Sequence, residues 1–365
     1  MGMRSYAQPS MAASLDRSSR SHENLSAYFA YFGEFECPPL GGQIYQALCR
    51  EIKDDRELLD LAAKASSTQP PPNLLFAAVH YLLLAGEPHS LRQWYPELAQ
   101  GDANPVGSVY PPFRDFCLTH PTKIAELIET QRVQTNVLQR CSVLLPGFTQ
   151  VFFRGGKKPL SLVEIGASAG LNLQWDHFSY RYDDGATWGQ ANSPVSIQCE
   201  IRGETSLPRI PENLPVSWRR GIDLHPIDLH NEDQVLWLRA LAWPDHPGRQ
   251  ERLTSAIQMA QESPVTVLEG DAAASLAELI AQAPDESTLC VYGTHTLYQF
   301  PPNALIATLS SMQTASAKRT IHFLSAEGTA APDAELFWTI YEDGGRETHR
   351  LARCCPHGRW LAWLG

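Results

Sequence analysis

The spacing of apolar residues changes in character near residue 150. Before that point, apolar residues recur at helical intervals between proline-rich breaks at 70–72 and 111–112, and few segments have the composition of strands. The stretch 124–145 predicts one long amphipathic helix that ends at Pro146. We therefore expect a helical domain over residues 21–149.

Beyond Lys158 the chain shows short, continuous apolar runs, each followed by a glycine or an acidic residue and then by a helical segment. Such runs are typical of parallel strands in a sheet that is covered on both faces. The runs are SLVEIG, SWRRGIDL, VTVLEGDA, TLCVYGTH and TIHFLSAEG. They predict an α/β domain over residues 150–365 with a Rossmann-like, doubly wound and mostly parallel sheet.

Two segments depart from this alternation. Within an insertion at about 175–215, apolar and polar residues alternate at 178–182 and again at 195–201, with a turn at 183–185, which predicts an inserted β-hairpin. The runs 336–341 and 348–354 flank a turn at 343–345. They predict an antiparallel pair that closes the edge of the main sheet.

Composition narrows the classes of partner. The 365 residues include 29 basic and 40 acidic side chains, for a formal net charge of −11. This charge has the wrong sign for a protein that neutralises nucleic-acid phosphates, so no nucleic-acid partner is expected. No apolar run approaches the roughly 18 to 20 residues that span a bilayer, so no membrane segment is expected either.

The first 20 residues and the cysteines favour a cytoplasmic location. Residues 1–20 lack the apolar core of a secretory signal, and disorder is the expectation for them. The eight cysteines are scattered without a CxxC spacing, as in reduced intracellular proteins. His225, Asp228 and His230 are ligand-type residues, but their spacing matches no strong zinc pattern, and no metal is expected.

The run 163–172, VEIGASAGLN, combines a strand, an acid, a loop of small residues and the start of a helix. Small residues let a ligand approach the backbone, and a helix start offers unpaired N–H groups, which favours a nucleotide-like ligand. The same letters match the hydrolase elbow G-x-S-x-G, with Ser168 as nucleophile and a late His357 in the order that such enzymes use. A hydrolase needs several strands before its elbow, which the helical first part does not provide.

Polar residues follow the later strands at their carboxyl ends. GIDL places Asp223 after the second strand, where a ribose would meet an acceptor, and EGDA places Asp271 after the third. His295 follows the fourth strand, and Glu327 follows the fifth. Open α/β sheets bind ligands at this edge, so we expect a small-molecule site there.

The ordered motifs ExGxSxG, GIDLHP and GDA resemble the cofactor motifs of class I S-adenosylmethionine-dependent methyltransferases. More closely, VQTNVLQRC, VEIGASAGLNL, GIDLHPIDL, LAWPDHPGRQERL, GDAAASL and PHGRWLAWL resemble the bacterial domain-of-unknown-function family 2332. The second resemblance covers nearly the whole chain after about residue 22, but it implies no activity. The first covers only the C-terminal half, and it implies S-adenosylmethionine as cofactor.

The methyltransferase resemblance implies a set of cofactor contacts on the loop and at the next two strand ends. In that family the acid organises the loop, the small residues pack the amino acid end of the cofactor, and the later acids bind ribose and adenine. The implied contacts are Glu164, Gly166, Ser168, Gly170, Asn172, Asp223, Leu224, Asp271 and Ala272. Asp271 is equally suited to cap the helix that begins at Ala272.

The chain departs from the methyltransferase pattern twice. Ser168 replaces the usual middle glycine, which a negative φ at this residue would accommodate. Asp223 lies much farther from Glu164 than the roughly 20 residues of an uninterrupted βαβ unit. The inserted hairpin accounts for much of that distance.

His295 is the candidate catalytic base, because histidine titrates near neutral pH and follows a strand at the proposed ligand edge. It is equally compatible with a structural hydrogen bond to a carbonyl group. Weaker candidates for the wall of a substrate pocket are Asn136, Arg140, Tyr180, Tyr182 and Arg202.

Three functions follow from these patterns. The first is methylation of an O or N atom of a small molecule with S-adenosylmethionine, which needs few catalytic side chains beyond those that align the acceptor and remove a proton. The second is a non-catalytic cofactor-binding or partner-binding module of the same fold. The third is a serine hydrolase that uses Ser168.

Overall fold

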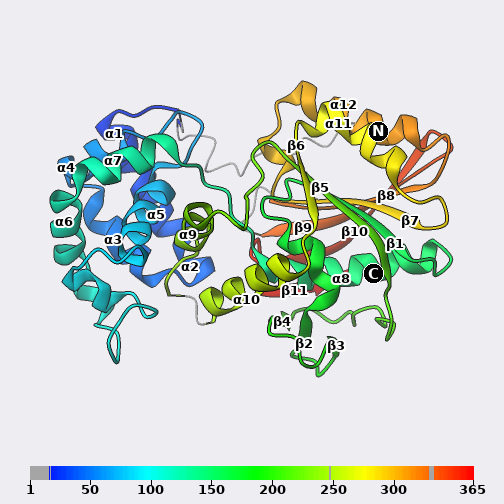
Figure 1. Ribbon diagram of the computed structural model, residues 1–365, viewed down its shortest axis with the longest axis horizontal. Helices are drawn as coiled ribbons and strands as arrows, with labels where there is room; N and C mark the ends of the chain where they lie inside the picture. The colour runs from blue at the N-terminus through cyan, green and yellow to red at the C-terminus, as the bar shows by residue number, and fades with distance from the viewer. Residues whose placement is uncertain (1–15, 17, 246–247, 329–332) are drawn as a thin grey trace. The chain divides into compact units, whose positions relative to one another are not determined.

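The computed structural model describes residues 16, 18–245, 248–328 and 333–365 and divides into two compact units (Figure 1). Of the described residues, 16–135 and 230–254 form a helical unit, and 136–229 and 255–365 form a sheet unit. The expected boundary at 149/150 therefore falls inside the helix α8 (Cys141–Arg154), which belongs to the sheet unit. The disorder expected for residues 1–20 lies mostly outside the described residues.

The helical unit is built around α5 (Pro71–Leu84), whose residues are buried on almost every side. A helix that is apolar all round forms the centre of a bundle rather than its surface. The surrounding helices include α1 (His22–Tyr31), α3 (Gln43–Ile52), α4 (Arg56–Ala62), α6 (Tyr110–Thr119), α7 (Pro121–Thr130) and α9 (Glu232–Ala240). Short turns complete the unit: η2 (Phe32–Glu36), α2 (Cys37–Leu40), η3 (Ser90–Trp94) and η4 (Val106–Ser108).

The prediction of a single helix over 124–145 is wrong. The helix α7 ends at Thr130, an irregular segment follows, and η5 (Leu138–Arg140) leads into α8, which contains Pro146 in its interior. Proline has no N–H for the carbonyl four residues earlier, and that carbonyl, of Ser142, accepts a hydrogen bond from the hydroxyl of Tyr182 instead (2.8 Å). A side chain distant in sequence thus lets the helix continue through the proline.

The sheet unit contains one large, mostly parallel sheet. Its eleven described strands lie in the order β3-β2-β4-β11-β10-β9-β8-β7-β1-β5-β6. The five strands β8, β7, β1, β5 and β6 are all parallel. The strands are β1 (Leu160–Ile165), β2 (Ser179–Tyr182), β3 (Thr187–Gly189), β4 (Ser196–Ile201), β5 (Val216–Asp223), β6 (Thr266–Glu269), β7 (Thr288–Thr294), β8 (Ile321–Gly328), β9 (Ala334–Glu342), β10 (Gly345–Cys354) and β11 (Trp360–Trp363).

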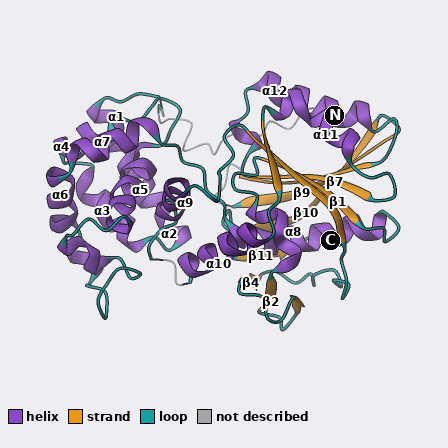
Figure 2. Ribbon diagram, viewed as in Figure 1, coloured by secondary structure: helices purple, strands orange, loops and turns teal. Residues whose placement is uncertain are grey.

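Helices cover both faces of this sheet (Figure 2). On one face, α11 (Ala272–Gln282) and α12 (Pro302–Ala315) enclose a core to which β1 contributes Val163 and Ile165. On the other face lies α8, where Phe148 packs edge-on against Tyr292 of β7. The five apolar runs that predicted parallel strands are confirmed as β1, β5, β6, β7 and β8. The helix α10 (Arg249–Glu262) precedes β6.

The two antiparallel expectations need correction. The runs at 178–182 and 195–201 form β2 and β4, which pair in parallel, while the hairpin is made by β2 with the short β3. The pair β9 and β10 is antiparallel as expected, but it does not close the sheet, because β11 pairs with β10 and then with β4. The insertion therefore extends the main sheet. The described residues contain no helix long and apolar enough to cross a bilayer.

Candidate functional site

The order of the strands places a switch point at β1. From β1 the chain proceeds to β5 and β6 on one side, and later to β7 and β8 on the other. Loops that leave neighbouring parallel strands in opposite directions open a space at the carboxyl edge, and ligands bind there in sheets of this type. The loop 166–170 leaves β1 at this point.

The loop 166–170 has a left-handed backbone at three positions. Gly166 and Gly170 both have φ near 72°, and a Cβ on Gly166 would lie 2.4 Å from Oγ1 of Thr296. Ser168 has φ 55° rather than the negative value that would suit it, so its backbone is strained. Its hydroxyl oxygen is buried and has no hydrogen-bond partner.

Asp223, at the end of β5, holds this loop in place. Its Oδ2 accepts a hydrogen bond from the N–H of Ser168 (2.8 Å), and its Oδ1 accepts one from the N–H of His225 (2.9 Å). The N–H of Gly166 also donates to the carbonyl of Ile222 (2.9 Å). Asp223 therefore ties the loop to the end of β5 with both of its carboxylate oxygens.

Glu164 lies beneath the loop and is 2% exposed. Its Oε2 accepts a hydrogen bond from the hydroxyl of Tyr292 (3.2 Å), and Asn172 also hydrogen-bonds to this carboxyl group. Burial raises the pKa of Glu164 to about 8, against the opposing effect of these hydrogen bonds. The thiol of Cys141 in turn donates to Oδ1 of Asn172 (3.5 Å). Glu164 is therefore an internal support of the loop.

Glu327, near the end of β8, is a second buried acid, 3% exposed. Its Oε1 accepts hydrogen bonds from the N–H groups of Thr296 and Leu297 (3.1 Å each), while its Oε2 is buried without a partner. Burial raises the pKa of Glu327 to about 7. The side chain of Thr296 lies next to Gly166 of the loop, and the N–H of Thr296 donates to Glu327. Thr296 therefore connects Glu327 to the loop.

Arg140 supplies the positive charge near both acids. Its Nε donates to the carbonyl of Pro356 (3.0 Å) and its Nη1 to that of Thr294 (3.4 Å). Burial lowers the pKa of Arg140, and attraction to Glu327 and Glu164 opposes that effect. The carboxyl edge thus combines one partly buried guanidinium group with two buried carboxyl groups.

His295 directly follows β7 and has φ 53°, a second strained position at this edge. Its N–H donates to the carbonyl of Ala326 (2.9 Å), while the imidazole has no hydrogen-bond partner among the described residues. Burial, with a smaller effect from Arg140, holds the pKa of His295 well below its ordinary value. The ring is therefore neutral at neutral pH and is a weaker base than an ordinary imidazole.

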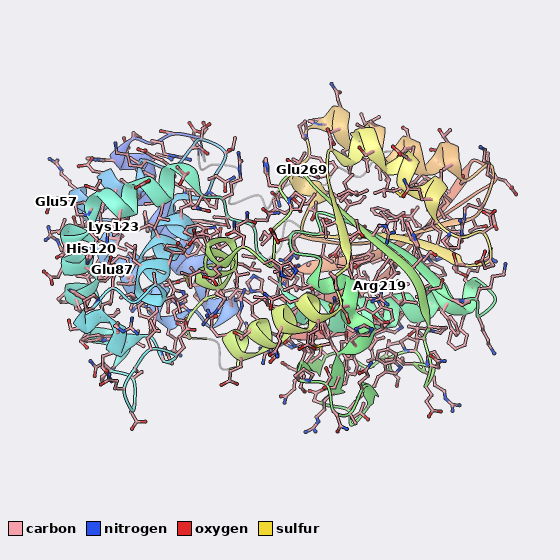
Figure 3. All side chains as sticks on the ribbon, viewed as in Figure 1. Glu57, Glu87, His120, Lys123, Arg219 and Glu269 are labelled. Carbon is pink, nitrogen blue, oxygen red and sulfur yellow. The ribbon has the colours of Figure 1, made fainter. Side chains whose placement is uncertain are left out.

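The end of β6 lies beside that of β5. The N–H of Gly270 donates to the carbonyl of Asp223 (2.8 Å), and Glu269, labelled in Figure 3, is exposed. Asp271 accepts a hydrogen bond from the N–H of Ala273 (2.8 Å), so it caps α11, and Ala272 is buried beneath it. Leu224, in contrast, is 58% exposed beside Asp223.

Two of the five candidates for a pocket wall, Asn136 and Arg140, lie at the loop. The Oδ1 of Asn136 accepts a hydrogen bond from the N–H of Leu171 (3.1 Å), at the start of η6 (Leu171–His177). This contact anchors the end of the loop opposite to Asp223. Asn136 is 9% exposed, so its role here is internal support.

The other three wall candidates lie elsewhere. The hydroxyl group of Tyr180 is buried and donates to the carbonyl of Trp175 (2.7 Å). The hydroxyl group of Tyr182 is also buried and donates to the carbonyl of Ser142 (2.8 Å). Arg202 is exposed and forms a two-bond ion pair with Glu200 (2.8 and 3.0 Å). Within the described residues, none of these three side chains forms a hydrogen bond or ion pair with the loop: Tyr182 supports α8, and Arg202 pairs within the insertion.

Sequence reasoning missed the importance of Glu327. The only indication was its position after the last parallel strand, in the same acid-glycine pair that ends β6. Its unpartnered oxygen and the nearby guanidinium group of Arg140 are visible only in the structure. Among the described residues, no group of three or more His, Cys, Asp or Glu side chains has the arrangement of a metal site.

Comparison with known proteins identifies the family. The family described as an uncharacterized protein conserved in bacteria (DUF2332) matches residues 27–363. No curated protein and no solved structure matches the chain. The chain therefore belongs to this bacterial family.

Proposed function

We propose that this member of the family is a methyltransferase that binds S-adenosylmethionine at the carboxyl edge of β1, β5 and β6 and methylates an O or N atom of a small molecule. The observation that carries the proposal is the placement of Glu164, Asp223 and Asp271 at the ends of these three neighbouring strands, around the loop 166–170. A Rossmann-like domain of the class I methyltransferase type binds its cofactor with acids in this order. The sheet order, with its switch point at β1, supports the same assignment.

The residues at this edge fit the cofactor. Asp223 is partly exposed, and its carboxylate is the kind of acceptor that ribose hydroxyl groups use. The exposed Leu224 next to it offers apolar contact to an adenine ring. Glu164, fully occupied beneath the loop, would hold the backbone rather than touch the cofactor.

In the proposed reaction, S-adenosylmethionine supplies a methyl group that is activated by its positive sulfur. The protein has to orient the acceptor and take up the proton that the acceptor loses. Glu327 suits that role, because its Oε2 is unpartnered and its pKa of about 7 allows the carboxylate to gain a proton near neutral pH. His295, the candidate base from the sequence, is neutral at this pH, but its lowered pKa makes it the weaker proton acceptor at the same edge.

Calorimetric titration of the full chain with S-adenosylmethionine, and with its demethylated product, tests the proposal. We expect saturable binding of both to the wild-type protein. Asp223→Asn should weaken this binding about tenfold, since it removes the charge and one strong acceptor. The substitution keeps one oxygen to accept an N–H group of the loop. Asp285→Asn, at the amino edge of the sheet, is the matched control and should bind as tightly as the wild type.

Transfer of a labelled methyl group into a metabolite extract separates an enzyme from a non-catalytic cofactor-binding module. Binding without transfer would favour the binding module, and absence of binding to either compound would refute the cofactor assignment. Circular dichroism of each variant confirms that lost binding does not reflect lost folding.

One observation favours a serine hydrolase as a second candidate. Ser168 occupies a strained turn directly after a strand, as the nucleophile of an elbow does. Its oxygen, however, is buried and has no hydrogen bond to a base. Labelling of Ser168 by a fluorophosphonate probe would support the hydrolase, and a lack of labelling would exclude it.

A further inference from the structure

A separate cavity lies at the opposite, amino edge of the parallel strands, and the proposed function does not use it. It has a volume of 240 Å³ and lies where β7 and β8 begin and β9 ends. Six of the side chains that line it are charged or can be charged: Arg154, Lys158, Asp285, Arg319, His322 and Glu342. Three are cations at neutral pH and two are carboxylates, so the lining carries a net positive charge.

His322 presents a fixed hydrogen-bond donor to this cavity. The side chain is 2% exposed, and its Nδ1 accepts a hydrogen bond from the indole N–H of Trp338 (3.2 Å). A neutral imidazole that accepts at Nδ1 carries its proton on Nε2. Burial lowers the pKa of His322 to about 4, so the ring stays neutral at neutral pH. Among the described residues, Nε2 has no hydrogen-bond partner.

Hydrogen bonds hold Arg319 and Arg154 in the wall of the cavity. Arg319 donates to the carbonyls of Ala283 (2.8 Å), Pro284 (3.0 Å) and Ser287 (2.9 Å). Arg154 pairs with Glu342 (3.3 Å). Arg319, which also lies 3.9 Å from a carboxylate oxygen of Asp285, is therefore held in position before any ligand arrives, which lowers the entropy cost of binding. Arg154 is more exposed and pairs only at the surface.

Lys158 differs from the two arginines. It is exposed at the mouth of the cavity, and within the described part of the chain no hydrogen bond or ion pair engages its ammonium group. Glu342 is already shared by Arg154 and by the hydroxyl of Thr320 (2.8 Å). Lys158 is thus the cation that remains available for a ligand.

We propose that this cavity binds the phosphate group of a small phosphorylated molecule. A phosphate group offers several oxygen acceptors, which match the ammonium group, the guanidinium groups and the neutral N–H donor that line the cavity from different elements. The cavity is larger than a phosphate ion alone and leaves room for a small organic part. The cavity lies at the edge remote from the loop 166–170, so binding here is independent of the proposed methyl transfer.

Calorimetric titration of the full chain with inorganic phosphate, at constant ionic strength and near neutral pH, tests this site. We expect saturable binding that Lys158→Ala weakens about tenfold, because one charge-assisted hydrogen bond is lost. Lys318→Ala removes the same charge from an exposed side chain outside the cavity lining, and it should leave the affinity unchanged. Arg154→Gln, which also lines the cavity, should weaken binding by a similar factor.

Acetate serves as the competing probe. Phosphate should bind at least about tenfold more tightly than acetate if a phosphate group is the ligand chemistry. Absence of saturable phosphate binding, equal affinity in Lys158→Ala and Lys318→Ala, or acetate binding as tight as phosphate binding would each overturn the proposal. Thermal melting of each variant shows whether the fold is retained.

Discussion

Glu164 and Glu327 are both buried carboxyl groups near Arg140, yet their surroundings give them different capacities. Burial raises the pKa of Glu164 to about 8 and that of Glu327 to about 7. Glu164 is held by hydrogen bonds from Tyr292 and Asn172, whereas Glu327 leaves Oε2 without a partner. A carboxyl group with an unpartnered oxygen and a pKa near neutrality is suited to exchange a proton.

Glu327→Gln should make the stability of the protein less sensitive to pH. Folding raises the pKa of Glu327 from its ordinary value of 4.5 to about 7. Between pH 4.5 and about pH 7, Glu327 therefore holds a proton in the folded protein that it has lost in the unfolded chain. Stability contributed by this proton is present at low pH and is lost as pH rises through about 7. Relative to the wild type, the variant should gain on the order of 1 to 3 kcal/mol between about pH 5 and about pH 8.

Urea unfolding of both proteins at the two pH values measures this difference. Glu278→Gln, an exposed substitution on α11, is the matched control and should show no comparable gain. A constant difference between Glu327→Gln and the wild type at both pH values would contradict the raised pKa of Glu327.

At the scale of single residues, the sequence indicated which strand ends carry polar side chains, because an acid or histidine after an apolar run is visible in the chain itself. The structure shows what those side chains do. Asp223 is engaged by the N–H of Ser168, and Asp271 caps a helix. The left-handed backbone of Ser168 and the unpartnered oxygen of Glu327 depend on neighbours distant in sequence, so no local pattern predicts them.

At the scale of elements, the loop 166–170 is fixed at both ends by side chains from other segments. Asp223 of β5 holds the N–H of Ser168, and Asn136, which precedes α8, holds the N–H of Leu171. Neither anchor is close to the loop in sequence. Such anchoring is how a loop with strained residues keeps one conformation.

Asn136→Ala should lower the free energy of unfolding of the sheet unit by about 1 to 3 kcal/mol, because the buried N–H of Leu171 loses its acceptor. Asn136→Asp retains an oxygen at the same position and is the matched variant, with a smaller loss. Urea unfolding followed by circular dichroism compares the two. Equal stability of Asn136→Ala and the wild type would show that the loop does not depend on this anchor.

Elements whose pattern is local were predicted well. The five parallel strands appear where apolar runs predicted them. The strands β1, β7 and β8 are buried along almost their whole length, as continuous apolar runs require, whereas β5 and the edge strand β6 are only partly buried. The prediction of one helix over 124–145 was wrong, because the apolar spacing in this stretch comes from two helices with an irregular segment between them. The continuation of α8 through Pro146 depends on the hydroxyl of Tyr182, which lies in another element.

At the scale of the whole molecule, the helical unit is completed by a late segment of the chain. Residues 230–254 contribute Trp237, Leu241 and Trp243 to its core. The ring of Trp243 lies 5.5 Å from that of Phe32 and 5.4 Å from that of Tyr45. The unit is therefore discontinuous in sequence, and its core needs both segments.

Trp243→Ala should lower the free energy of unfolding of the helical unit by about 3 to 5 kcal/mol, because a large buried ring is removed from a packed core. Trp243→Phe keeps an aromatic ring and should cost less. Urea unfolding followed by far-ultraviolet circular dichroism provides the comparison. If both variants unfold at the wild-type denaturant concentration, residues 230–254 do not contribute to the stability of this core.

Local sequence pattern was enough to predict a helical first part, five parallel strands, and small and acidic residues at the strand ends. These follow from periodicity and from the residues that end each run, because burial and turn formation act on neighbours in the chain. The tertiary structure decided which strands are adjacent, how the insertion extends the sheet, and which late segment completes the helical unit. It also decided which acids are buried, because desolvation and unsatisfied hydrogen bonds arise only when distant segments pack together.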